Sequence, residues 1–166
     1  MPKRIHKIQG ISLGTASSNT RYGKKEDSLL VTLPQESILS GKFTSNKLKA
    51  APVKLAIEHL SNAKKAKKVL LINAGNANAA TGPKGLRDVR KYCKEIALDF
   101  KTSQENVIPF STGVIGEPLA IENYLSAFRE ASKGLSENKW KKAAEAILTT
   151  DTKPKIISKE VKVGKT

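Results

Sequence analysis

Apolar residues fall along the chain in short runs that alternate with segments of helical spacing. A short apolar run bounded by Pro, Gly or polar residues is typical of a β-strand. This pattern predicts strands or extended segments in seven places: Ile5–Leu13, Leu29–Leu33, Ile38–Phe43, Val53–Ile57, Val69–Ile72, the short run of Val107 and Ile108, and Ile156–Val163. The continuous apolar character of Val69–Ile72 favours a strand that is covered on both faces.

Two of these predictions depend on proline. Pro34 ends the second segment, and a hairpin is expected to join that segment to Ile38–Phe43. Pro52 would occupy the first position of the strand at Val53–Ile57, where its missing N–H group is tolerated.

Helical spacing of apolar residues predicts three longer helices, and a short polar helix is expected within Glu58–Lys68. The apolar faces consist of Leu86, Val89, Cys93, Ile96, Ala97 and Phe100 in the first, Ile121, Leu125, Phe128 and Ala131 in the second, and Trp140, Ala143, Ala144, Ile147 and Leu148 in the third. Gly134 is expected to close the second helix, and Ser136 to cap the third. This mixture of strands and helices predicts an α/β fold with sheet and helices in layers.

The stretch Pro109–Pro118 connects the predicted central strand to the second long helix. It contains Ser111, Thr112 and two glycines, Gly113 and Gly116. A strand that enters such a turn leaves backbone N–H groups unpaired, and glycine allows another molecule to approach that backbone closely. One N–H group and one hydroxyl could then stabilise a negative charge that develops on a carbonyl oxygen. From these residues alone, an ordinary polar loop is the more common explanation.

Two further polar segments follow predicted elements. Asn73–Gly85 carries three Asn residues between a buried strand and a helix, and Thr149–Thr152 combines hydroxyl side chains with Asp151. The first segment is unlike a phosphate-binding loop, because its glycine spacing differs and Pro83 occupies the position of the lysine. All three polar segments offer hydrogen-bond donors, and none contains an evident pair of nucleophile and base.

The chain is strongly basic, with 30 Lys and Arg against 15 Asp and Glu among 166 residues. Such a charge is compatible with nucleic acid, an anionic membrane surface or small anionic substrates. Most of the cations are scattered lysines, whereas specific readout of bases or phosphates favours arginine. A solvated, lysine-rich surface is therefore the simpler explanation, and a basic binding protein for nucleic acid or anionic ligands remains the alternative hypothesis.

Cysteine and histidine are too sparse to predict a metal site. Cys93 is the only cysteine, so no disulfide can form within the chain, and its helical position predicts a buried apolar role. His6 and His59 are isolated, and His59 is expected on a helix surface. No apolar run approaches the roughly 20 residues that span a bilayer, and the charged start at Met1–Lys7 lacks the apolar stretch of a signal peptide. The expected location is the cytoplasm.

Five motifs occur in an order that is specific to one family. They are Phe43-Thr44-Ser45-Asn46, Ala50-Ala51-Pro52-Val53, Asn73-Ala74-Gly75-Asn76-Ala77-Asn78-Ala79 with Thr81-Gly82, Ser111-Thr112-Gly113-Val114-Ile115-Gly116, and Thr149-Thr150-Asp151-Thr152. The succession resembles the N-terminal part of the bifunctional glutamate N-acetyltransferase, or ornithine acetyltransferase, of arginine biosynthesis. The matches extend from Gly10 to Pro154.

The resemblance implies the layered fold of that family and a mechanism. A precursor cleaves itself before a threonine into an α chain and a β chain, and the new N-terminal threonine of the β chain is the nucleophile, with its own amine available as the base. The acetyl group passes from N-acetylornithine to this threonine and then to glutamate. By resemblance, Thr112 and Gly113 form the oxyanion hole. Thr150 is our choice for the substrate-binding residue, with Thr149 and Thr152 as alternatives.

The sequence departs from the family pattern at its C-terminal end. The cleavage segment, with its substrate-binding lysine and nucleophilic threonine, is absent, so residues 1–166 are expected to be one α-chain portion without that segment. The resemblance further implies a separate β chain and an α2β2 heterotetramer, with no metal, no cofactor, no nucleic acid and no membrane. It leaves open whether acetyl-coenzyme A is a co-substrate. The isolated chain is expected to be inactive.

Overall fold

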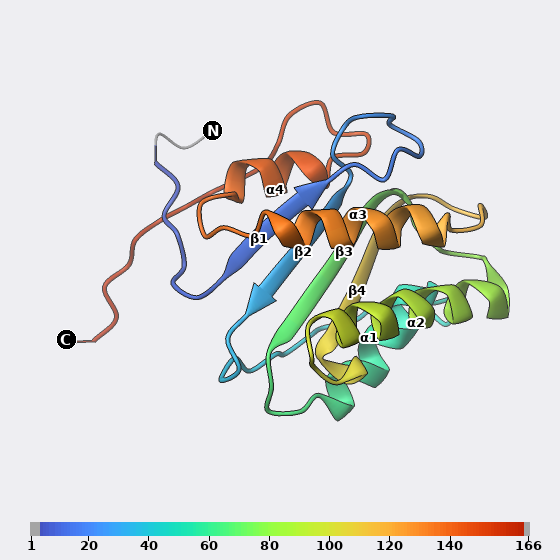
Figure 1. Ribbon diagram of the computed structural model, residues 1–166, viewed down its shortest axis with the longest axis horizontal. Helices are drawn as coiled ribbons and strands as arrows, with labels where there is room; N and C mark the ends of the chain where they lie inside the picture. The colour runs from blue at the N-terminus through green and yellow to red at the C-terminus, as the bar shows by residue number, and fades with distance from the viewer. Residues whose placement is uncertain (1–3, 165–166) are drawn as a thin grey trace.

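A computed structural model describes residues 4–164 of the chain. Its elements follow in the order β1 (Ser12–Ala16), β2 (Ser28–Leu33), α1 (Ala51–Asn62), β3 (Lys68–Asn76), α2 (Gly82–Asp99), the short 3-10 helix η1 (Gln104–Asn106), β4 (Val107–Val114), α3 (Ile121–Lys133) and α4 (Trp140–Ala146). The strands form one sheet in the order β1-β2-β3-β4, in which only β3 and β4 are parallel (Figure 1). The predicted α/β fold is confirmed.

The main core lies on the sheet face that packs against α1, α2 and α3. Leu30 of β2 and Val69 and Leu71 of β3 point into this core, where they are fully buried. Successive side chains of a strand point to opposite faces, so the apolar run of β3 divides between two environments. On the helical side, Tyr92 of α2 packs against Phe128 of α3 with ring centroids 5.7 Å apart.

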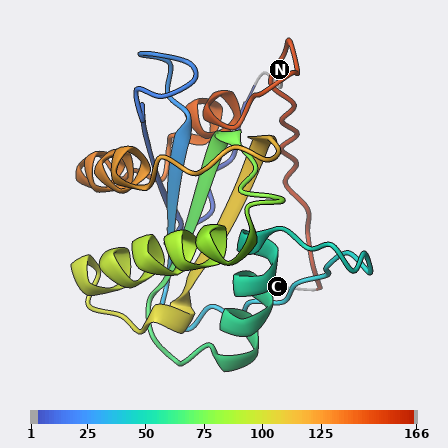
Figure 2. The same cartoon turned by 90° about the vertical axis from the view of Figure 1, so that its right-hand side faces the viewer.

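The opposite face of the sheet is covered less completely. Figure 2 shows the sheet nearly edge-on, with α3 on one side and α4 on the other. Ala143 of α4 contributes to a smaller apolar cluster with Leu13, Leu29 and Val31, which belong to β1 and β2. Over β3 and β4, in contrast, Ile72 is only partly buried and Phe110 is 43% exposed. The strand predicted at Val69–Ile72 is confirmed, but its two faces are buried unequally.

The helices predicted from apolar spacing are confirmed, with different ends. α2 begins earlier than Leu86, at Gly82, and α3 has Gly134 at its C-cap as expected. α4 is shorter than its apolar pattern and ends at Ala146. Ser136 does not cap it, because the helix begins at Trp140 with Lys139 in the N-cap position. The backbone of Ser136 forms a two-way hydrogen-bonded bridge with Leu13 of β1.

The strand predicted at Val53–Ile57 is wrong, because these residues belong to helix α1. Pro52 lies in the first turn of that helix, where the missing N–H group would have no partner in any case. The buried positions Leu55, Ala56 and His59 recur at helical spacing and face the core. Alternation of apolar residues over only five positions did not distinguish this face from a strand.

Two other predicted strands do not form. Ile38 is 94% exposed in the irregular connection between β2 and α1, so the hairpin around Pro34–Ser37 is also wrong. Ile156–Val163 is irregular as well, and Ile157 is 94% exposed. A strand needs a neighbour for its backbone hydrogen bonds, and neither segment pairs with the sheet.

Within residues 4–164, no helix has the length and apolar character needed to cross a membrane. Residues 1–3 of the charged N-terminus lie outside the described residues.

Candidate functional site

The candidate site lies where the parallel strands β3 and β4 end. Their register pairs Asn73 with Ser111 and Gly75 with Gly113, so Thr112 and Gly113 belong to β4 and the turn begins only after Val114. Gly113 has a φ of +134°, and a Cβ atom on it would lie 2.3 Å from the carbonyl carbon of Gly75. The sequence suggested that Gly113 admits another molecule to the backbone, whereas the structure shows that the neighbouring strand occupies this approach.

Strand alternation separates the two hydroxyl residues of β4. Ser111 pairs with Asn73, on the face that carries Val69 and Leu71, and its hydroxyl donates to Asn73 Oδ1 at 2.6 Å on that core side. Thr112 is two residues from Phe110 and therefore lies on the incompletely covered face, where it is partly buried. The hydroxyl of Thr112 thus lies on the partly open face of strand β4.

The asparagines at the end of β3 and just after it bind neighbouring segments of the chain. Asn76 donates from Nδ2 to the carbonyl oxygens of Glu117 and Pro118, at 3.2 and 3.1 Å. Asn78, which is fully buried, donates from Nδ2 to Gly85 O at 3.0 Å and accepts the Thr81 hydroxyl at 2.7 Å. The expectation of a donor-rich loop holds, but these amides fix the polypeptide and are not left free for a ligand.

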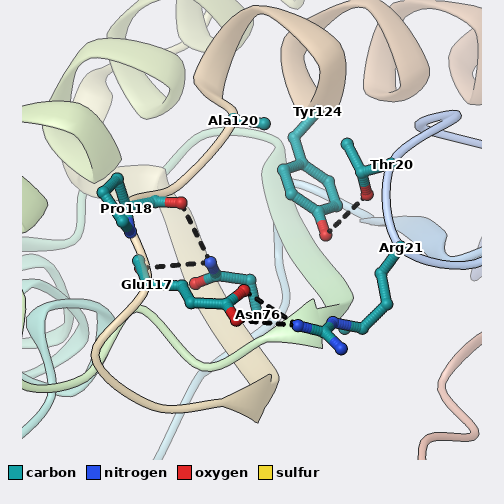
Figure 3. A pocket seen from close by; sticks show the side chains of 8 residues that line it. Thr20, Arg21, Asn76, Glu117, Pro118, Ala120 and Tyr124 are labelled. Atoms are coloured by element: carbon teal, nitrogen blue, oxygen red, sulfur yellow. Dashed lines mark hydrogen bonds and ion pairs between the residues drawn. The ribbon is translucent and has the colours of Figure 1, made fainter.

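A cavity of about 330 Å³ lies beside the end of β3 (Figure 3). Its rim is closed by an ion pair in which Arg21 Nη2 lies 2.9 Å from both carboxylate oxygens of Glu117. On its other side, the Tyr124 hydroxyl donates to Ala74 O at 3.0 Å and accepts from Thr20 at 3.4 Å. The ion pair joins the β1–β2 loop to the segment that follows β4, so both loops are held at this end of the sheet.

The segment Thr149–Thr152 is irregular, and Thr150 is exposed. Asp151 forms an ion pair with Lys155 at 2.7 Å, and Lys25 Nζ donates to Leu148 O at 3.1 Å. The second contact places the segment beside the β1–β2 loop, as Figure 1 also shows. Thr150, in this irregular segment, and Thr112, near the end of β4, therefore lie at the same end of the sheet, but within the described residues no hydrogen bond joins them.

His59 and Cys93 have structural positions. His59 is 1% exposed and its Nδ1 lies 2.7 Å from Val107 O, so the prediction of a surface histidine is wrong. Burial lowers the pKa of His59, with the hydrogen bond to Val107 opposing the shift. Cys93 is fully buried as predicted, and burial raises the pKa of its thiol well above the usual range. Across residues 4–164, no three His, Cys, Asp or Glu side chains gather as a metal site would require.

Fold and site together define an α/β domain whose polar loops meet at the carboxyl ends of two parallel strands, next to a partly open sheet face. The profile of the ArgJ family matches residues 12–166 of the chain. The chain belongs to the ArgJ family, and the resemblance drawn from the five motifs is confirmed.

The chain is similar to proteins named arginine biosynthesis bifunctional protein ArgJ. It is 42% identical to that of Methylococcus capsulatus over 161 residues, which cover 97% of this chain and 39% of the relative. It is 39% identical to that of Colwellia psychrerythraea, over 99% of this chain and 41% of the relative. The chain therefore spans about two fifths of the length of these relatives.

Two solved structures share the fold. The crystal structure of ornithine acetyltransferase from Mycobacterium tuberculosis, complexed with ornithine, matches with a TM-score of 0.79 and 26% identity, over 87% of this chain and 78% of that one. The arginine biosynthesis bifunctional protein from Bacillus halodurans matches with a TM-score of 0.76 and 28% identity, over 90% and 81% of the two chains.

Sequence reasoning did not single out Arg21, Glu117 or Tyr124, which line the cavity. Arg21 and Glu117 are 96 positions apart, and nothing in the local sequence of either residue indicates the other. Of the residues that line this cavity, the five ordered motifs contain only Gly75 and Asn76, and the pairing of Arg21 with Glu117 became visible only in three dimensions.

Proposed function

We propose that this chain is the α-chain portion of an ornithine/glutamate acetyltransferase, which moves an acetyl group from N-acetylornithine to glutamate. The observation that carries the proposal is the place of Thr112. It lies next to Gly113 in β4, on the sheet face that the described helices leave partly open. Membership of the ArgJ family favours this enzyme over a basic binding protein for nucleic acid or anionic ligands, a hypothesis that rested on net charge alone.

In the proposed reaction, the hydroxyl of the N-terminal threonine of the β chain attacks the acetyl carbonyl of N-acetylornithine, and its own amine accepts the proton. Ornithine leaves with a free amine, and the acetyl group remains on the threonine. The amine of glutamate then attacks this ester and releases the threonine. In both attacks a negative charge develops on the carbonyl oxygen, and the Thr112 hydroxyl and the Gly113 N–H group donate hydrogen bonds to it.

Thr150 is the proposed substrate-binding residue of the chain. Thr150 is exposed at the end of the sheet where β4 ends. The hydrogen bond from Lys25 to Leu148 O holds its segment there. Thr149 and Thr152 are the neighbouring alternatives. The proposal includes no metal and no bound cofactor.

The proposed partner is a β chain from the same precursor, in an α2β2 heterotetramer in the cytoplasm, with residues 1–166 as a single portion of the α chain. Two observations support a partner. The relatives are about two and a half times as long as this chain, and Phe110 and Thr112 share a face that residues 4–164 cover incompletely. The nucleophile would then approach Thr112 from that face.

An acetyl-transfer assay with the Thr112→Ala variant of the complete enzyme, β chain included, tests the proposal. Loss of one oxyanion donor typically lowers the rate about 10²–10³-fold, so we expect kcat to fall by that factor with a smaller change in KM. Thr112→Ser keeps a hydroxyl and should retain more activity, while both variants fold normally. The 166-residue chain alone should be inactive.

Two outcomes would contradict the proposal. One is a kcat of Thr112→Ala within about threefold of the parent, well short of the loss expected for an oxyanion donor. The other is transfer of acetyl from N-acetylornithine to glutamate by the 166-residue chain unaided.

A further inference from the structure

We propose that Asn73 is a positioning residue for the oxyanion hole, and that it acts on Thr112 through the hydroxyl of Ser111. The inference rests on the proposed function, because it assigns Asn73 to the same acyl-transfer site. Asn73 belongs to β3 and does not itself reach the open face where the reacting atoms would lie, so it is not a catalytic residue.

The contacts of Asn73 use both ends of its amide. Its Oδ1 accepts the Ser111 hydroxyl at 2.6 Å, and its Nδ2 donates to Asn76 O at 2.7 Å. Asn73 is fully buried, where an amide that loses a partner cannot regain one from solvent. A side chain that is both acceptor and donor is therefore required at this position, and Asp, Leu or Ala would each leave a buried group unpaired.

A second amide continues the chain of contacts. Asn76, whose carbonyl oxygen Asn73 binds, donates from its own Nδ2 to the carbonyl oxygens of Glu117 and Pro118 (Figure 3). The polypeptide is thus fixed to β3 on both sides of Thr112 and Gly113, at Ser111 before them and at Glu117 and Pro118 after them.

In this arrangement one residue of β4 restrains the strand and the next carries the proposed oxyanion donor. Ser111 faces the core and Thr112 faces the open surface, so a bond to the Ser111 side chain restrains the Thr112 backbone without blocking its hydroxyl. An oxyanion donor contributes only when it is fixed at its place before the reaction. Removal of the Asn73 amide should therefore lower turnover through a displaced Thr112.

The chain offers a matched control in Asn106. This residue is also fully buried, lies at the opposite end of β4, and uses both ends of its amide, which accepts Lys64 N–H at 2.9 Å and donates to Thr102 at 3.1 Å. Asn73→Ala and Asn106→Ala should both lower the melting temperature of the enzyme. Only the loss of Asn73 should change the chemistry.

The experiment measures kcat, KM and thermal stability of the complete enzyme carrying Asn73→Ala, Asn106→Ala, Ser111→Ala and Thr112→Ala. Misplacement of a reacting group by about 1 Å can cost about 100-fold in rate, so we expect kcat to fall about 10- to 100-fold in Asn73→Ala and Ser111→Ala, with little change in KM. Asn106→Ala should stay within about twofold of the parent, because its contacts do not reach the site.

A double variant shows whether Asn73 acts through Thr112. If it does, Asn73→Ala should cost far less in a Thr112→Ala background than in the parent, because the donor that it positions is already gone. Additive losses would overturn the inference. Ser111→Ala, which removes one hydroxyl only, supplies the same comparison if Asn73→Ala does not fold.

The outcomes separate this inference from the proposed function. If Thr112→Ala keeps the parent kcat, the oxyanion assignment itself fails. If Thr112→Ala loses turnover while Asn73→Ala and Ser111→Ala keep it, only the positioning role fails. An equal loss of kcat in Asn73→Ala and Asn106→Ala would show that the loss comes from general destabilisation, and it would also overturn the positioning role of Asn73.

Discussion

At the scale of single residues, His59 connects α1 to the start of β4. Its ring is buried and its Nδ1 lies 2.7 Å from Val107 O, which is an acceptor, so this nitrogen carries the proton. A neutral imidazole satisfies this bond, whereas a second proton would place a charge in the core. Burial accordingly lowers the pKa of His59.

This burial predicts how the stability of the chain depends on pH. The unfolded chain binds a proton at a pKa of about 6.5, the ordinary value for histidine, and the folded chain binds it only at lower pH. The contribution of His59 is therefore complete above that value and is lost as the pH falls toward the lowered pKa of the folded state. A single proton limits the slope to about 1.4 kcal/mol per pH unit.

Urea unfolding between pH 5 and 8 measures this slope. His59→Gln should be less stable than the parent at neutral pH and should flatten the curve below pH 6.5, the ordinary value for histidine. His6→Gln changes the only other histidine, which lies outside the core clusters, and is the matched control variant. An undiminished slope in His59→Gln would assign the pH dependence to other groups.

At the scale of elements, the close approach of β3 and β4 depends on Gly113. Gly75 and Gly113 are partners in the register, both with positive φ, and the backbone of Gly75 fills the space where a Gly113 side chain would be. The strands meet there without intervening side chains. A Cβ atom on Gly75 would instead meet Tyr22 and Arg21, so it is Gly113 whose lack of a side chain allows β4 to approach β3 at this point.

We predict that Gly113→Ala destabilises the chain more than Gly116→Ala. Gly116 also has a positive φ, +85°, but a Cβ atom there would meet nothing within 4 Å. Backbone strain of about 1–2 kcal/mol should therefore be common to both variants, and overpacking should add about 1–3 kcal/mol for Gly113 alone. Denaturant unfolding of the two variants measures the difference, and equal losses would show that the strands can separate freely.

At the scale of the whole molecule, the sheet has one face buried by three helices and another covered mainly over β1 and β2. Phe110, Ile72 and Thr112 lie over the less covered half, at the end of the sheet where the polar loops meet. An apolar surface beside polar groups is typical of a contact with another polypeptide. This asymmetry suits a chain that forms only part of a longer protein.

The Phe110→Asp variant tests this interpretation. In the 166-residue chain we expect a small change in stability, because Phe110 is already 43% exposed. In the complete enzyme, a charge buried in the proposed contact should prevent assembly with the proposed β chain, measured by co-purification and size-exclusion chromatography. Ile38→Asp alters a 94% exposed apolar residue in a loop and should leave assembly intact. Normal assembly of Phe110→Asp would place the contact elsewhere.

The sequence by itself determined the elements whose signals are long or unambiguous. α2 and α3 follow from apolar residues at helical spacing over three or more turns, and β3 follows from a continuous apolar run. The ordered motifs also determined the family, because five segments in a fixed succession are far more specific than any one of them. Cys93 was placed correctly in the core, since its neighbours in the helix are apolar.

Tertiary structure decided the elements with short patterns. Val53–Ile57 shows three alternating apolar residues, and only packing against β4 and α2 selects the helix. Ile38–Phe43 and Ile156–Val163 have strand-like composition but lack a partner strand, and backbone pairing is a property of two segments. The same distinction holds for the candidate site. Thr112 and Gly113 were named from the sequence. The contacts of Asn73 with Ser111 and of Arg21 with Glu117 join residues far apart in sequence, and only the register of the sheet and the packing of its loops bring them together.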